Sequence, residues 1–214
     1  MSSVAVSAPT DQRRSVSVFI AGAAGTTIVG LLVQALMIPT TDVADDRWSY
    51  PWETGPFVAV SLLYALLHLA VAIGLVGFGR SGVAGTSRSA RYGITLAVAG
   101  TLTLTVGELV GLPIGDALTD DTSAQVVGAV FGLGVLMSAI GLLMVGTATL
   151  RAHVWHDWRR YTPLVTGIWS SVMLVIPPTI PKALPGTVAV YGVGLLAMAI
   201  GLHRDSANQT KGLS

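Results

Sequence analysis

Apolar residues in this chain fall into six long runs separated by short polar segments. The runs cover 16–38, 55–79, 90–112, 124–150, 162–180 and 186–203, with ends placed to within several residues. About 20 apolar residues in a helix cross the hydrocarbon core of a bilayer, which is about 30 Å thick. The pattern predicts an all-α membrane protein, a six-transmembrane-helix bundle that occupies residues 16–203 as one domain.

The fifth run is interrupted by two prolines. Pro177 and Pro178 follow about 15 uninterrupted residues, and proline removes a backbone donor and clashes with the preceding helical turn. We therefore expect a broken or tilted helix there. The run still counts as a crossing. Without it, the sixth run would cross in the direction opposite to the one that the basic residues at its two ends predict.

Basic residues alternate from one polar segment to the next. Because Lys and Arg near helix ends stay on the cytoplasmic side, that side is expected to hold both chain ends, with 1–15 as a disordered N-terminus and 204–214 as a tail. Only Arg47 and Lys182 fall on the outer side. The cytoplasmic set comprises Arg13, Arg14, Arg80, Arg88, Arg91, Arg151, Arg159, Arg160, Arg204 and Lys211. The outer segments carry Asp42, Asp45, Asp46, Glu53, Asp116, Asp120 and Asp121.

Composition excludes several classes of protein. Charged residues make up 11% of the chain, against roughly 25% in soluble domains. The scattered basic residues lack the single basic face of a nucleic-acid binder. Cysteine is absent, which excludes disulfides and thiolate metal sites. His153 and His156 lie near Asp157 but have no third strong ligand nearby, so neither a metal nor another cofactor is expected.

Glycines recur at helical spacing in two of the runs. Small residues let membrane helices approach closely, so these positions predict tight packing between helices. They are Gly93, Gly100, Gly107 and Gly111 in the third run, and Gly128, Gly132, Gly134 and Gly141 in the fourth. The tetrapeptide Ala-Ile-Gly-Leu occurs in the second, fourth and sixth runs, and the sequence does not decide whether it marks a repeat.

Polar residues inside the second and third runs form two stripes. Glu108 is the only acidic residue clearly within an apolar run, and a carboxylate at helix centre costs roughly 2.5–3.5 kcal/mol to insert. Helical spacing and matching depth allow the stripes to face each other. They either cement the bundle or line an outward-opening pocket for a small apolar or cationic ligand. The candidate pocket residues are Glu108, His68, Tyr64, Ser61, Thr101, Thr105 and Gln34.

Aromatic residues gather in two of the polar segments. Trp48, Tyr50 and Trp52 lie just before the second run, as interface anchors or as an aromatic lid over the pocket that could hold a cation. The segment after the fourth run places Trp155, Trp158, Arg159 and Arg160 together. Trp and Arg suit the headgroup layer, so these four are expected to contact lipid headgroups.

A resemblance rests on that same segment. The stretch from Trp155 through Trp158, Arg159 and Arg160 to Pro163, Leu164 and Gly167 resembles a pattern in small multi-helix membrane proteins of actinobacteria. The family has no known activity. The resemblance implies only a location, the bacterial plasma membrane, which a multi-pass protein would occupy.

Three functions remain open at this point. The first is a non-enzymatic membrane protein of unknown role, whose polar stripes either pack the bundle or line a small outward-facing pocket. The second is a small-solute transporter or ligand sensor that uses Glu108 and His68. The third is an enzyme acting on a lipid or isoprenoid substrate, with the same two residues as acid and base. Oligomeric state is not indicated.

Overall fold

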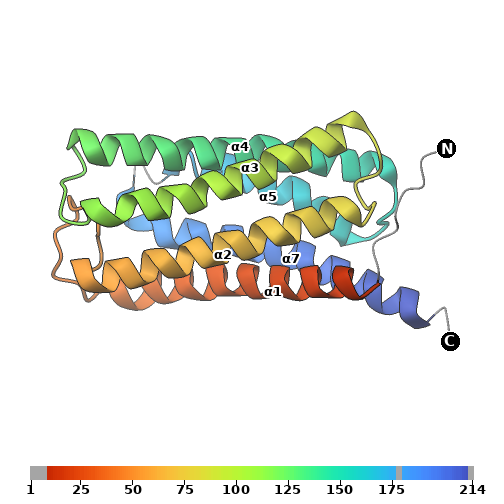
Figure 1. The fold of residues 1–214 in the computed structure, drawn as a ribbon, viewed down its shortest axis with the longest axis horizontal. Helices are drawn as coiled ribbons and strands as arrows, with labels where there is room; N and C mark the ends of the chain where they lie inside the picture. Colours follow the sequence, from red (N-terminus) through yellow and green to blue (C-terminus); the bar gives the residue numbers. More distant parts are fainter. Residues whose placement is uncertain (1–8, 177–179, 212–214) are drawn as a thin grey trace.

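The fold is a bundle of helices, seen in a computed structural model that describes residues 9–176 and 180–211 (Figure 1). Within these residues the β-structure is a single isolated bridge between Arg47 and Leu118. The long helices are α1 (Pro9–Leu32), α2 (Thr54–Arg80), α3 (Arg88–Gly111), α4 (Thr122–Ala152), α5 (Thr162–Val172) and α7 (Leu184–Lys211). Short helical turns are η1 (Val33–Met37), η2 (Leu112–Ile114), η3 (Trp158–Tyr161) and η4 (Pro181–Ala183).

Five of these helices are long and apolar enough to cross a membrane. They are α1 with η1, α2, α3 with η2, α4 and α7. Large apolar side chains on them point outward, among them Ile28, Leu66, Val106, Leu133 and Val193. A monomeric soluble protein rarely exposes so much apolar surface, so the bundle is that of a multi-pass membrane protein.

The fifth run differs from expectation. Its continuous helix, α5, has 11 residues, which reach only about 16 Å. After Val172 the backbone tightens, because Leu174 and Val175 donate to carbonyls three residues back. Pro177 and Pro178, expected to break this helix, lie outside the described residues. Five helices are thus long and apolar enough to span a membrane, and the sixth crossing, which would run through the shorter α5, stays a prediction.

The helical ends of the chain also extend further than expected. The segment 9–15, expected to be disordered, begins α1, and the residues after 203 continue α7 to Lys211. Helix caps mark other boundaries. Ser87 accepts a hydrogen bond from the Ala90 amide at the start of α3, as an N-cap residue does.

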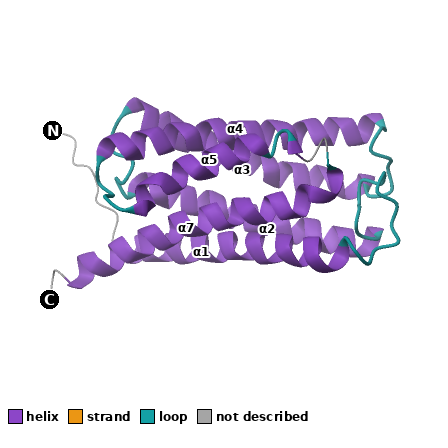
Figure 2. Cartoon of the chain, turned by 180° about the vertical axis from the view of Figure 1, so that it is seen from behind, coloured by secondary structure: helices purple, strands orange, loops and turns teal. Residues whose placement is uncertain are grey.

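The two chain ends lie at the same end of the bundle (Figure 1). We call this the basic end, because its connections carry the ten basic residues other than Arg47 and Lys182. At the opposite, acidic end, two loops are joined by backbone bonds from Trp48 to Ala117 and from Thr119 to Asp46. Lys182 pairs there with Asp45 at 3.2 Å. Most loops gather at the two ends of the bundle, whereas a loop after α5 lies between them (Figure 2).

Close backbone contact joins α3 to α4. A Cβ placed on Gly100 would lie 2.5 Å from the Ser138 nitrogen, and one on Gly141 would lie 2.4 Å from the Ala97 nitrogen. The tight packing predicted for these glycines is confirmed. Gly132, by contrast, faces open space. Elsewhere α1 packs between α2 and α7, and α5 lies against α4.

Candidate functional site

Three of the predicted pocket residues meet between α2 and α3. Ser61 and Tyr64 are one helical turn apart on α2, and the Ser61 hydroxyl interacts with the Glu108 carboxyl of α3. The Tyr64 hydroxyl lies close enough to Glu108 for their charges to interact. Ser61 is buried, while Tyr64 and Glu108 are partly exposed. We call these three residues the Glu108 site.

His68 continues the polar file along α2. Its ring stacks on Tyr64 with centroids 6.2 Å apart and planes at 30°. Only 8% of His68 is exposed, and its Nδ1 atom has no hydrogen-bond partner among the described residues. Tyr64 is therefore the neighbour that His68 and Glu108 share, and the file runs from the acidic end to about 20 Å along α2.

The two threonines of the stripe on α3 are satisfied by their own helix. Thr101 donates to the Ala97 carbonyl at 2.9 Å, and Thr105 donates to the Thr101 carbonyl at 3.3 Å. Thr101 also lies beside the buried hydroxyls of Ser138 and Tyr191. Side chains that bond their own backbone need no ligand, so this part of the stripe packs the bundle.

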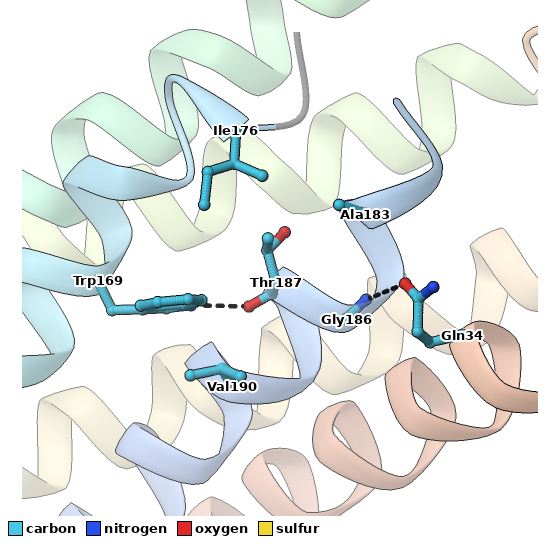
Figure 3. Close-up of a pocket in the computed structure, with 7 residues that line it drawn as sticks. All are labelled: Gln34, Trp169, Ile176, Ala183, Gly186, Thr187 and Val190. Atoms are coloured by element: carbon cyan, nitrogen blue, oxygen red, sulfur yellow. Dashed lines mark hydrogen bonds between the residues drawn. The ribbon is translucent and has the colours of Figure 1, made fainter. Parts of the chain in front are cut away.

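Gln34 belongs to a different place. Its Oε1 atom accepts a hydrogen bond from the Gly186 amide of α7 at 2.9 Å. Gln34 lines an open cavity beside α5 and α7 (Figure 3). The expectation that Gln34 joins the α2–α3 pocket is therefore corrected. The cavity was missed because it depends on where α5 ends, which the apolar pattern does not show.

Of the three aromatic residues before α2, Trp48 packs against α3 and α4. The Trp48 ring lies 6.2 Å from the Phe131 ring of α4, at 44°, and close to Gly111 at the end of α3. Trp48 thus covers the α3–α4 side of the bundle. Tyr50 and Trp52 lie in turns of the same loop, with amides bonded to the Arg47 and Ser49 carbonyls.

Trp155 was expected among headgroups and is instead 1% exposed. Its indole N–H donates to the Asp205 carboxylate near the end of α7. The Phe78 ring packs edge-on against it at 5.7 Å, and the Arg159 guanidinium lies 5.4 Å from its centroid. The expectation of lipid contact is wrong for Trp155, because a charged partner and two side chains hold it inside the protein.

Arg159 joins two carboxylates at the basic end. Its Nε donates to Asp157 Oδ1 at 2.8 Å, and its Nη1 donates to Asp205 Oδ1 at 2.5 Å. The hydrogen bond with Asp157 raises the pKa of Arg159 and lowers the pKa of Asp157. We call Trp155, Asp157, Arg159 and Asp205 the basic-end latch, because they tie the α4–α5 connection to α7.

Trp158 and Arg160 remain at the surface of the same connection. Trp158 is 48% exposed, and the Arg160 guanidinium lies 4.6 Å from the centre of the Tyr161 ring. Trp158 is thus exposed, and Arg160 is partly exposed. The prediction of lipid contact therefore stays open for these two.

Neither metal chemistry nor relatives add to this picture. Within residues 9–176 and 180–211, no three His, Asp or Glu side chains come together as a metal site would need. No known protein family, curated protein or solved structure matches the chain.

Proposed function

We propose that the chain is a multi-pass protein of the bacterial plasma membrane, with six crossings and both termini in the cytoplasm. The five long helices cross directly, and the sixth crossing runs through α5. Arg159 at the basic end and Lys182 at the acidic end bracket this segment. The side that holds both termini carries ten of the twelve basic residues, as cytoplasmic sides do.

We further propose that the protein is not an enzyme and binds a small cationic solute at the Glu108 site, as a sensor or a transporter. The observation that carries this proposal is the convergence of Ser61 and Tyr64 of α2 on the Glu108 carboxyl of α3. A cation would balance the carboxylate, and the Tyr64 ring offers it an aromatic face. The acidic loops at the same end would raise the local concentration of cations.

An enzyme acting on a lipid or isoprenoid substrate has less support. An acid and a base must reach the same reacting atoms. Here the Tyr64 ring stacks on His68, and its hydroxyl lies within electrostatic range of Glu108, so the two groups are arranged in file rather than around one point. Pure packing by polar side chains is the alternative that a binding experiment has to separate.

Replacement of Glu108 by Gln tests the proposal. Purified protein in detergent is melted with and without tetramethylammonium, methylammonium, Na⁺ or K⁺. We expect at least one of these cations to raise the melting temperature of the wild type, because a ligand that binds only the folded state stabilises it. Glu108→Gln should abolish that rise.

Glu53→Gln is the matched control, because Glu53 is an exposed carboxylate at the same end of the bundle. It should respond to the cation as the wild type does. Equal stabilisation of Glu108→Gln, or no response of the wild type to any of the four cations, would contradict the binding proposal and leave packing as the role of the site.

A further inference from the structure

The break after α5 leaves a cavity in the wall of the bundle. α5 ends at Val172 and α7 begins at Leu184, so the helix α5 is missing from the half of the bundle nearer the acidic end. The cavity there measures about 310 Å³, at the lower end of the range for ligand pockets. Its lining comes from η1, α5 and α7 and from the chain near the break (Figure 3). The residues are Gln34, Trp169, Ile176, Ala183, Gly186, Thr187 and Val190.

Three polar groups of this lining are hydrogen-bonded within the protein. The Trp169 indole N–H donates to the Thr187 carbonyl at 2.9 Å, and the Thr187 hydroxyl donates to the Leu184 carbonyl at 2.8 Å. The Gln34 side-chain oxygen accepts from the Gly186 amide. A water molecule needs two to four polar partners. The lining therefore favours an apolar occupant over water.

The surroundings of the cavity are those of a lipid-facing surface. Val175 and Ile180 expose more than half of their surface, and Leu184 exposes nearly half. All three lie within a few residues of the lining in the sequence. Residues of this kind face acyl chains in a bilayer. An acyl chain is thus the apolar group present at the mouth of the cavity.

One positive charge lies next to the lining in the sequence. Lys182 immediately precedes Ala183 of the lining, and its side chain is 58% exposed. Its ion pair with Asp45 joins two exposed side chains, and such pairs are weak and exchangeable. Asp45 raises the pKa of Lys182, so the ammonium keeps its charge. A cation beside an apolar cavity suits a phosphate attached to an acyl chain.

We propose that this cavity binds one acyl chain of an anionic phospholipid from the leaflet at the acidic end, with the lipid phosphate next to Lys182. The site is separate from the Glu108 site, so either proposal can fail without the other. The Trp169 ring and the Val190 side chain would contact the chain, and Ala183 would lie below the headgroup.

The first test fills the cavity. The full chain is reconstituted into nanodiscs that contain phosphatidylglycerol. Native mass spectrometry then counts the lipid molecules that stay bound to the released protein. Ala183→Phe should retain phosphatidylglycerol about tenfold more weakly, as when roughly two methylenes no longer fit. Val193→Phe is the control, because Val193 lies on α7, the helix that follows Ala183, is 53% exposed and is not part of the lining. It should retain lipid like the wild type.

The second test addresses the phosphate. Lys182→Gln should reduce the preference for phosphatidylglycerol over phosphatidylcholine, whereas Arg47→Gln, which removes the other basic residue of the acidic end, should not. An unchanged preference in Lys182→Gln would overturn the assignment of the phosphate. Unchanged retention in Ala183→Phe, or no retained lipid in the wild type, would overturn the site.

A third measurement does not depend on the folding of Ala183→Phe. Phosphatidylglycerol with brominated acyl chains quenches tryptophan fluorescence on contact. Quenching in the wild type should exceed that in Trp169→Phe by the contribution of Trp169. Equal fractional quenching in the two proteins would place no acyl chain against Trp169 and would overturn the proposal.

Discussion

Trp155 and Trp158 are three residues apart, yet the protein uses them differently. Trp155 is buried by Phe78, Arg159 and the carboxylate of Asp205, which lies 50 residues further along the chain. Trp158 has no comparable enclosure and stays at the surface. The local sequence predicts aromatic residues near an interface, but it does not contain the distant partner that draws one of them inside.

Replacing Trp155 by Phe should destabilise the folded protein. The variant removes the indole N–H that donates to the Asp205 carboxylate. A hydrogen bond to a charged group contributes about 1.5–3 kcal/mol. Trp158→Phe, at the exposed position, should change stability by less than about 0.5 kcal/mol. Melting in detergent, followed by circular dichroism, measures both. Equal losses in the two variants would contradict the role assigned to Trp155.

Asp157 should make the basic-end latch sensitive to acid. Because hydrogen bonding from Arg159 lowers the pKa of Asp157, its stabilising effect is complete above the ordinary aspartate pKa of 3.8. The effect is lost as pH falls through the lower pKa of the folded state. The melting temperature of Asp157→Asn should therefore lie slightly below that of the wild type near neutral pH. The difference should close in strong acid, and a difference independent of pH would refute this account.

At the scale of elements, the contact between α3 and α4 depends on glycine. The spacing of Gly93 and Gly100 on the third run predicted this packing from sequence, because small residues at helical intervals have few other uses in a membrane. Which glycines meet a partner depends on the rotation of each helix, and the spacing does not contain that rotation. Gly132 belongs to the same pattern and faces open space.

Gly100→Ala and Gly132→Ala should therefore differ in sign. A methyl group at Gly100 would meet the Ser138 backbone and hydroxyl, and overpacking of this kind costs about 1–3 kcal/mol. At Gly132 a methyl group meets nothing within 4 Å, so the better helix propensity of alanine should be neutral or favourable. Unfolding of the two variants in mixed micelles gives the comparison. A loss at Gly132 as large as at Gly100 would show that glycine flexibility, not close approach, matters.

The fifth run shows that the apolar pattern does not determine where a helix ends. Fifteen apolar residues before two prolines predict an interrupted helix. The α-helix ends earlier, at Val172, after which the hydrogen bonds shift to a tighter three-residue spacing. The cavity beside Trp169 and Gly186 follows from that early end, so it could not be foreseen from the prolines alone.

At the scale of the whole molecule, the sequence predicts the helices better than the site. Apolar runs are long and separated by charges, and five of the six become long helices near their predicted places, whereas the fifth gives only the short α5. The meeting of Glu108 with Ser61 and Tyr64 was also expected, because depth along two neighbouring helices follows from the helical rise. The position of Gln34 was not expected. The helix that carries Gln34 packs between α2 and α7, and the sequence does not show which of the two Gln34 faces.

The number of crossings decides on which side of the membrane Lys182 and the C-terminus lie. If α5 and the segment after it cross the membrane, Lys182 lies outside and the C-terminus lies inside; if they do not, the C-terminus emerges on the opposite side from the N-terminus. The crossing is favoured because Lys182 pairs with Asp45 at the acidic end while Arg159, before α5, pairs with Asp205 at the basic end.

Reporter fusions distinguish these arrangements. Alkaline phosphatase, which is active only outside the cytoplasm, should be active when fused after Lys182 and inactive when fused after Arg160 or at the C-terminus. A fluorescent protein that folds only in the cytoplasm should give the reverse pattern. The fusion after Arg160 is the control, because both arrangements place it inside. An external C-terminus would contradict the sixth crossing. The Glu108 site and the tail would then lie toward the same side of the membrane.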